Sequence, residues 1–254
     1  MKYIVIIISF LATSFLFGQT SSEIQKSLAE HLNKMTYYKF QAPNDDSVNT
    51  YNTLFKKLFL KYLGDDPSSM RDNMDIIVKA GLIIASSEDK QFRIYSWDTQ
   101  SGGTMHFYDN VYQYAAGDKV FVKESMNDTE GDPKSWYSEI YTMKDKEKKY
   151  YLGVYNAEYS TRDIAQGIKF FAIENNSLNT DVKLAKTTDG NVNELGISFN
   201  FFSLQNHDER PLKLVLFDKS KNTISVPVVQ NENDSITNKL TLYQYQNGLF
   251  EKVK

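Results

Sequence analysis

The sequence contains no cysteine among its 254 residues. This absence excludes a disulfide framework, thiol catalysis, iron–sulfur ligation and cysteine-type zinc sites. It also excludes a lipid anchor on an N-terminal cysteine. A protein of this size without disulfides has to be held together by its core. Its 17 tyrosines and 16 phenylalanines supply enough bulky side chains for a substantial one.

Histidine is scarce as well, since only His31, His106 and His207 are present. His31 is expected to face solvent on a helix. His207 is followed by two acidic residues, but neighbouring residues of a turn rarely all face one ion. The stretch "MNDTEGDPKS", which begins at Met126, resembles a calcium loop, but Met126 stands where the first aspartate should be. The sequence therefore predicts no metal, no cofactor and no catalytic residues.

A basic excess is also missing, because the formal net charge is −3 and the isoelectric point is near 5.7. Nucleic-acid partners usually require a basic face, so none is expected. The short basic run from Lys144 to Lys149 is interpreted as a solvated turn.

Long apolar runs are absent except at the N-terminus, where Ile4–Phe17 follows Lys2. This run is shorter than the roughly 20 apolar residues that span a bilayer. Residues 1–18 are therefore interpreted as a secretory signal peptide cleaved near Gly18, with an uncleaved anchor as the alternative. We expect an exported bacterial protein, in the periplasm, on the outer surface or secreted, with no integral membrane segment after cleavage.

The segment 19–80 has helical periodicity. Ile24, Leu28, Leu32 and Met35 recur at helical spacing after a capping-box pattern at Ser22. A second helix is expected from Asp46 or Ser47 to Gly64, and a short third one from Pro67 to Asn73.

The period changes near Leu82, where short runs rich in tyrosine, phenylalanine, valine and isoleucine alternate with polar turns. The pair Asn247–Gly248 is typical of a two-residue hairpin. Strands are expected over 82–87, 91–97, 104–114, 119–124, 136–143, 149–157, 167–174, 181–186, 195–203, 212–217, 223–229, 238–245 and 249–253.

These patterns predict an α+β fold that is mainly β, with an N-terminal helical segment followed by a long antiparallel β-meander. The meander is expected to form a sandwich or an open barrel. A propeller-like array is the alternative, although only about three four-stranded blades are available, fewer than a closed propeller normally has. The β region 81–254 is expected to pack with segment 19–80 as one globular unit.

The stretch "RIYSWDTQSGGTMHFYDNVYQY", residues 93–114, gathers rare residue types around a glycine pair. Alternation predicts a hairpin with Phe92, Ile94 and Met105 on its inner face. The predicted register pairs Trp97 with Thr104, Tyr95 with His106 and Arg93 with Tyr108.

The outer face of this hairpin is the predicted binding site, since tyrosine, tryptophan and histidine rings suit stacking on a sugar or a peptide. The alternative is that the helices or a second sheet cover this face, so that its rings are packing groups. The candidate ligand-binding residues are Arg93, Tyr95, Trp97, Asp98, Gly102, Gly103, His106, Tyr108 and Asn110.

Three functions are left open by the sequence. The first is an exported, non-enzymatic binding or scaffold protein that recognises a carbohydrate or a peptide. The second is a hydrolase of envelope polymers that uses a pair of carboxylates. The third is a purely structural envelope component. The sequence does not indicate an oligomeric state.

Overall fold

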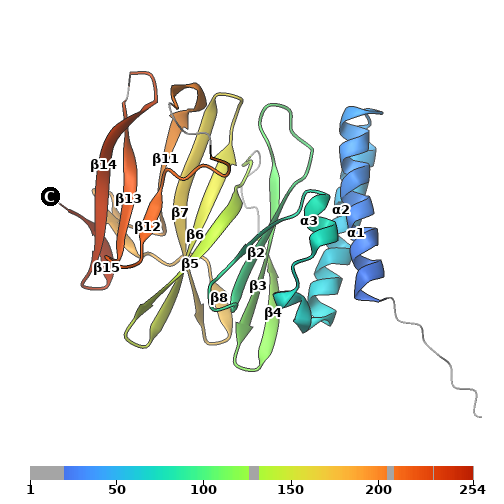
Figure 1. Cartoon of the computed structure of the whole chain (residues 1–254), viewed down its shortest axis with the longest axis horizontal. Helices are drawn as coiled ribbons and strands as arrows, with labels where there is room; N and C mark the ends of the chain where they lie inside the picture. Colours follow the sequence, from blue (N-terminus) through green and yellow to red (C-terminus); the bar gives the residue numbers. More distant parts are fainter. Residues whose placement is uncertain (1–19, 126–131, 205–208, 231, 254) are drawn as a thin grey trace, which may run out of the picture.

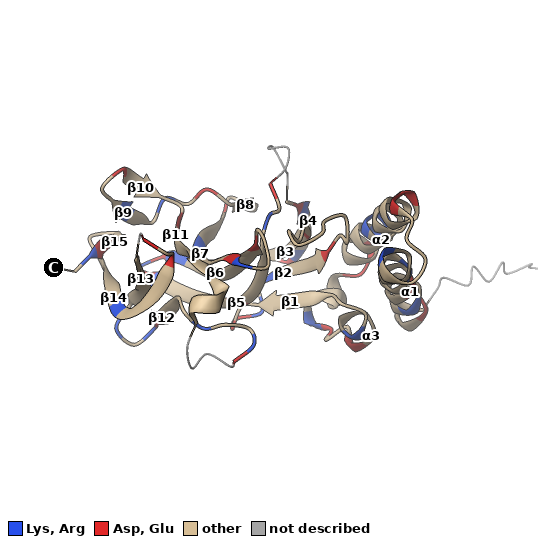
Figure 2. Cartoon of the chain, turned by 90° about the horizontal axis from the view of Figure 1, so that it is seen from above, with Lys and Arg blue, Asp and Glu red and all other residues tan. Residues whose placement is uncertain are grey.

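The structure, a computed structural model, describes residues 20–125, 132–204, 209–230 and 232–253. Helices occupy one end of the molecule and three β-sheets follow one behind another (Figure 1, and from above in Figure 2). The signal-peptide prediction, the core of the candidate calcium loop and His207 lie outside the described residues. Within the described part of the chain, no helix has the length and apolar character needed to cross a membrane.

The N-terminal segment forms an antiparallel pair of helices with well-defined starts. Helix α1 (Ser21–Phe40) begins with a capping box in which Thr20 and Glu23 bond each other's backbone amides. Helix α2 (Asp45–Asp65) is capped by Asn44, whose side chain accepts a hydrogen bond from the Ser47 amide. The predicted third helix, 67–73, is a 3₁₀ turn, η1 (Pro67–Arg71), and the short α3 (Asp75–Lys79) that follows it was not predicted. The capping box of α1 lies at Thr20, two residues before the predicted position at Ser22.

The β region folds into three sheets, here called A, B and C. Sheet A has the order β1-β2-β3-β4, sheet B the order β11-β7-β6-β5 with β8 beside β7, and sheet C the order β10-β9-β15-β14-β13-β12. The strands are β1 (Ile83–Ser86), β2 (Phe92–Asp98), β3 (Tyr108–Ala116), β4 (Lys119–Glu124), β5 (Trp136–Asp145), β6 (Lys148–Glu158), β7 (Asp163–Glu174), β8 (Ser177–Asn179), β9 (Ala185–Thr187), β10 (Gly190–Val192), β11 (Glu194–Asn200), β12 (Leu216–Asp218), β13 (Thr223–Gln230), β14 (Ser235–Gln246) and β15 (Leu249–Lys252).

Three hydrophobic clusters join the successive layers. The first packs the helices against β2 and β3, with Phe55 and Phe59 against Tyr95 and Trp97. The second packs the opposite face of sheet A against sheet B, through side chains such as Phe92 and Phe171. The third packs the far face of sheet B against sheet C, with Phe170 stacked on Phe250. Sheets A and B are thus each covered on both faces.

The predicted fold class is confirmed, because the chain is α+β, mainly β, and its sheets are built from antiparallel neighbours apart from one parallel pair, β15 with β9. The described strands form no closed barrel. They form stacked sheets and do not surround a central channel, so the propeller-like alternative is wrong (Figure 1). The Asn247–Gly248 hairpin is confirmed, with both residues at positive φ between the paired Gln246 and Leu249.

Several strand predictions were wrong in their limits: 181–184 do not belong to β9, 201–203 do not belong to β11, and β7 begins four residues earlier than predicted. Residues 104–107 do not belong to β3, and 212–215 do not belong to β12. The short strands β8 and β10 were not predicted, since three residues carry too little alternation to be recognised. The expectation that His31 faces solvent was also wrong, because its ring lies half-buried against Tyr51 and burial lowers its pKa.

Candidate functional site

Strands β2 and β3 form the hairpin predicted for residues 93–114, but their register differs from the prediction. Strand β2 pairs with β3 so that Tyr95 lies opposite Val111, Trp97 opposite Asp109 and Asp98 opposite Tyr108. Residues 99–107 form a loop between the strands. The predicted pairs Trp97–Thr104, Tyr95–His106 and Arg93–Tyr108 are therefore wrong. The register differs because β3 begins at Tyr108, four residues later than predicted, so the loop between the strands is longer.

The predicted outer face of β2 is covered by the helices. Tyr95 and Trp97 are fully buried, and Arg93 is nearly so. The Trp97 indole donates a hydrogen bond to the Asn52 side chain at 2.8 Å, and the Tyr95 hydroxyl donates to the Gln113 side chain at 2.7 Å. These three residues are therefore packing groups of the helix–sheet layer and are closed to a ligand, as in the alternative interpretation.

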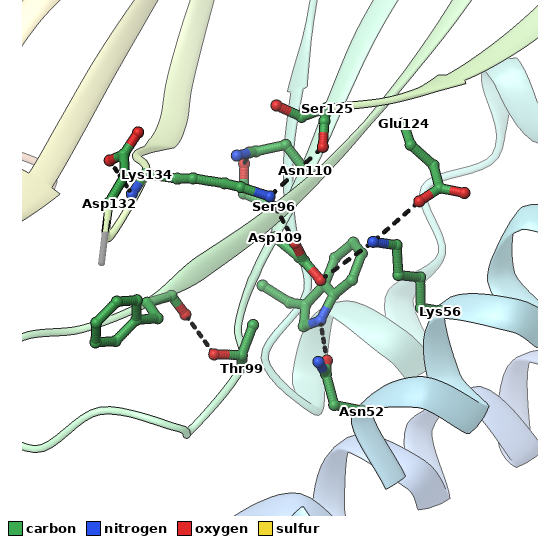
Figure 3. A network of polar contacts seen from close by, with 12 residues as sticks. Asn52, Lys56, Ser96, Thr99, Asp109, Asn110, Glu124, Ser125, Asp132 and Lys134 are labelled. Atoms are coloured by element: carbon green, nitrogen blue, oxygen red, sulfur yellow. Dashed lines mark hydrogen bonds and ion pairs between the residues drawn. The ribbon is translucent and has the colours of Figure 1, made fainter. Parts of the chain in front are cut away.

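Asn110 is also internal and joins a network of polar contacts (Figure 3). Its side-chain amide donates to the Ser135 carbonyl at 2.9 Å, and its carbonyl accepts from the Ser96 hydroxyl at 2.6 Å. In the same network, the ammonium of Lys134 lies 2.9 Å from the Asp109 carboxylate, and that of Lys56 lies 3.5 Å from it. Because these contacts tie α2, sheet A and residues 132–135 together, the role of Asn110 is structural.

The remaining candidates, Asp98, Gly102, Gly103, His106 and Tyr108, gather at the 99–107 loop and its two ends. The Thr99 amide and hydroxyl both donate to the Phe107 carbonyl, and the ammonium of Lys39 donates to the Gly102 carbonyl. A Cβ on Gly102 would lie 1.9 Å from the Met105 carbonyl oxygen, so only glycine fits there. Contacts with α1 and with the end of β2 therefore hold the loop in one conformation.

This loop forms one wall of a pocket of about 510 Å³. Gly103, Thr104 and His106 come from the loop, and Trp136, Asn156 and Glu158 come from the paired ends of β5 and β6. The opposite wall contains Phe201, Arg210 and Leu212. The pocket lies where the ends of sheets A and B meet the segment that leads into sheet C.

The opposite wall is fixed by buried polar contacts. The fully buried Gln166 on β7 accepts from the amides of Leu214 and Val215, and its own amide donates to the Leu212 carbonyl. The Phe201 amide donates to the Arg162 carbonyl in the β6–β7 turn at 2.7 Å. Both walls are therefore anchored to sheet B, which makes the pocket a preformed one.

Glu158 is the polar centre of the pocket. Its Oε1 accepts from the Tyr108 hydroxyl at 3.2 Å and from the Trp136 indole at 3.4 Å. Burial, together with the neighbouring carboxylates of Glu158 and Asp98, raises the pKa of Tyr108 well above its ordinary value. Tyr108 therefore stays protonated and donates, which leaves the Glu158 Oε2 to face the pocket.

His106 is held beside this carboxylate in a defined orientation. Its Nδ1 lies 2.6 Å from Asp98 Oδ2, and its Nε2 lies 3.8 Å from Glu158 Oε2. Because an ionised carboxylate only accepts, Nδ1 must carry the proton in this contact. The His106 amide additionally donates to the Glu158 carbonyl at 3.0 Å, which fixes the loop to β6.

Aromatic surface completes the pocket. Trp136 is half-buried, and its ring centre lies 6.5 Å from that of Tyr108. On the other wall, the Arg210 guanidinium lies 5.4 Å from the centre of the Phe201 ring. The pocket thus combines aromatic faces with a carboxylate, an imidazole and a guanidinium.

The residues missed by the sequence analysis are Trp136, Asn156, Glu158, Phe201 and Arg210. Trp136 and Asn156 are register partners across β5 and β6, so the predicted 144–149 turn could have placed them together, had the bulge after Tyr137 been known. No local pattern links them to Phe201 or Arg210.

Among the described residues, no group of three or more histidine, aspartate or glutamate side chains is arranged to hold a metal ion. Comparisons of the chain with protein-family models, with curated proteins and with solved structures found no match.

Proposed function

We propose that the protein is a non-enzymatic binding protein that takes up a carbohydrate in the pocket between the 99–107 loop and Phe201. The observation that carries this proposal is the half-buried Trp136 ring beside the fixed Glu158 carboxylate. A flat aromatic face packs against the C–H face of a sugar ring, while a carboxylate accepts from its hydroxyl groups.

The size of the pocket favours a small ligand over an extended polymer. The cavity of about 510 Å³ lies within the size range of small-molecule sites. One or two sugar rings would be enclosed, and a longer chain would leave over the exposed Thr161 rim.

We further propose that the protein is exported, on the basis of the apolar run Ile4–Phe17 after Lys2. Envelope glycans or extracellular saccharides are then the ligands within reach. Cell fractionation, with mass measurement of the mature N-terminus, tests this location separately from binding. A full-length chain that stays in the cytoplasm would refute it.

A hydrolase using a carboxylate pair has weaker support. Among the described residues that line the pocket, Glu158 is the only carboxylate, and His106 lies between it and Asp98, so these two do not stand opposite each other across an open cleft.

Tryptophan fluorescence tests the binding proposal directly, because Trp136 lines the pocket and Trp97 is fully buried among the helices. Titration with short soluble oligosaccharides is expected to shift the emission of the wild-type protein and leave that of Trp136→Phe unchanged. Binding by Trp136→Ala, measured by calorimetry, should be about tenfold weaker, as for loss of one aromatic stacking contact.

The matched control is Phe202→Ala, which removes an aromatic ring that is 70% exposed and does not line the pocket. This variant should keep the fluorescence response. The absence of any response from the wild-type protein to neutral, acidic and amino-substituted oligosaccharides would refute the carbohydrate proposal.

A further inference from the structure

Sheet C has one face that no described element covers. Its inner face packs on sheet B through side chains such as Phe217, Ile224 and Phe250. The other face points away from the molecule, at the end opposite the helices (Figure 1). Sheets A and B, in contrast, are covered on both faces. The outer face of sheet C is therefore the open end of the stack of layers.

Apolar side chains form a row across this outer face. The strand register pairs Leu216 with Ser225 and Ser225 with Leu242. The Val253 amide donates to the Leu242 carbonyl at 2.8 Å, which extends the row past the end of β15. Directly opposed residues of antiparallel strands share a face, and so does Leu240, two positions before Leu242. The three leucines and the valine are between 41% and 56% exposed, so this row is an open apolar surface.

The charged groups on the same face are paired within the chain. Strand alternation places Lys186, Asp218 and Glu251 on this face. The Lys186 ammonium lies 3.3 Å from the Glu251 carboxylate, and that of Lys221 lies 3.4 Å from the Asp218 carboxylate. The apolar row itself carries no charge. Such a surface does not select an oppositely charged partner, and two copies of it can meet without repulsion.

The outer face also has the size that a stable dimer needs. At the usual spacings, the six strands of sheet C span about 29 Å and the 12-residue β14 about 40 Å. Half of this outline is about 600 Å² of flat surface, and the accessible surface of its side chains is larger. Each partner in a standard interface buries about 800 Å² of accessible surface.

We propose that the outer face of sheet C binds the same face of a second copy of this chain, sheet against sheet, around a two-fold axis. A two-fold contact uses one patch on both chains, so the patch has to match itself, as a neutral apolar row does. Sheets packed in this way lie about 10 Å apart, and their side chains interdigitate. Because the residues that line the pocket lie outside the strands of sheet C, both pockets of the dimer stay open.

Analytical ultracentrifugation between about 1 and about 200 μM protein tests the dimer. The wild-type protein is expected to reach twice the mass of the chain as its concentration rises. Leu242→Lys should weaken the dimer at least about tenfold, because it removes an apolar side chain and brings two ammonium groups into the contact. The matched control is Leu54→Lys on α2, where the leucine is 43% exposed. This variant should dimerise like the wild type.

Crosslinking locates the contact independently of that charge substitution. Because the chain contains no cysteine, Leu242→Cys introduces a single thiol. A flexible bis-maleimide should join two copies of Leu242→Cys in dilute solution and should not join copies of Leu54→Cys. Thermal melts of each variant establish that it is folded, and if Leu242→Lys does not fold, the crosslinking result decides.

A wild-type protein that stays monomeric over the whole concentration range would overturn this inference. A dimer that Leu242→Lys retains, or that Leu54→Lys weakens equally, would overturn it by placing the contact elsewhere. Equal crosslinking of the two cysteine variants would do the same. The carbohydrate proposal is tested separately, since Leu242→Lys should keep the fluorescence response of Trp136 to oligosaccharides.

Discussion

Arg93 is a cation enclosed between sheet A and the η1 turn. Only 4% of the residue is exposed, and its guanidinium donates to the carbonyls of Ser69 and Asp72 and to the Ser86 hydroxyl. Buried charge is costly unless its donors are satisfied, and here backbone carbonyls do so. Arg93 therefore fixes η1 on the sheet. The sequence had instead predicted that its charge contacts a ligand.

Replacing Arg93 by methionine keeps an unbranched apolar stem and removes the donors of the guanidinium. The two carbonyls would then be left without a partner, so we expect the free energy of unfolding to fall by about 3 kcal/mol. Urea denaturation measures this change.

The matched control is Arg162→Met, where the arginine side chain is 55% exposed and pairs weakly with Asp163. This variant should stay within about 0.5 kcal/mol of the wild type. A similar loss for both variants would contradict the structural role of Arg93.

At the scale of the element, the pocket depends on the conformation of the 99–107 loop. It carries His106 to Glu158, and its shape depends on Gly102, which has no room for a side chain. Gly103 is next to it, but a Cβ there would meet nothing within 4 Å. The two glycines that looked equivalent in the sequence therefore have different roles.

We expect Gly102→Ala to displace the loop and break the contact between His106 and Asp98. In proton NMR, the strongly hydrogen-bonded Nδ1–H of His106 should give a downfield resonance in the wild-type protein and lose it in this variant. Gly103→Ala should retain the resonance. An unchanged spectrum for Gly102→Ala would show that the loop tolerates a side chain there.

At the scale of the molecule, sheet B is the central layer, since it packs on sheet A through one face and on sheet C through the other. Phe171 is fully buried between sheets A and B, in ring contact with Phe92, Tyr112 and Tyr137. A defect at this position is therefore felt by both layers, so it provides a test of the expectation that segments 19–80 and 81–254 form one globular unit.

Phe171→Ala is expected to lower the free energy of unfolding by about 4 kcal/mol through the cavity it leaves. Fluorescence of Trp97, in the helix layer, and far-UV circular dichroism should report one coincident transition. Phe202→Ala, at an exposed position, should change neither. Separate transitions by the two probes would show that the helical and β segments are independent units.

Buried tyrosines make the whole molecule sensitive to alkali. Burial raises the pKa of Tyr95 from 10 to about 12. Because the raised pKa favours the protonated folded state, this contribution is complete below pH 10 and is lost as the pH rises towards 12.

Tyr95→Phe should therefore be less stable at neutral pH by about 1 kcal/mol, for loss of the hydrogen bond to Gln113. Above pH 10 its stability should fall less steeply with pH than that of the wild type. Denaturation series across this range give the slope. Tyr37→Phe, at an exposed position, is the control and should keep the wild-type slope.

The elements themselves could largely be predicted because their causes are local. The Asn247–Gly248 turn, the end of α2 and the change from helical to alternating period near Leu82 each depend on residues a few positions apart. The limits of β3 and β12 could not be predicted in this way. Residues 104–107 and 212–215 have strand-like sequences, and their contacts with β6 and with Gln166 hold them in other conformations.

The sequence by itself determined the α+β class, the order of helices and strands, and the exclusion of cysteine chemistry. Only the tertiary structure decided which faces are covered. Alternation separates the two faces of β2 but does not say that helices cover the polar-tipped one, where partners such as Asn52 and Gln113 satisfy the polar atoms. The tertiary structure also created the pocket, because the packing of the layers brings His106, Glu158 and Phe201 together. No spacing of these residues along the chain encodes their proximity.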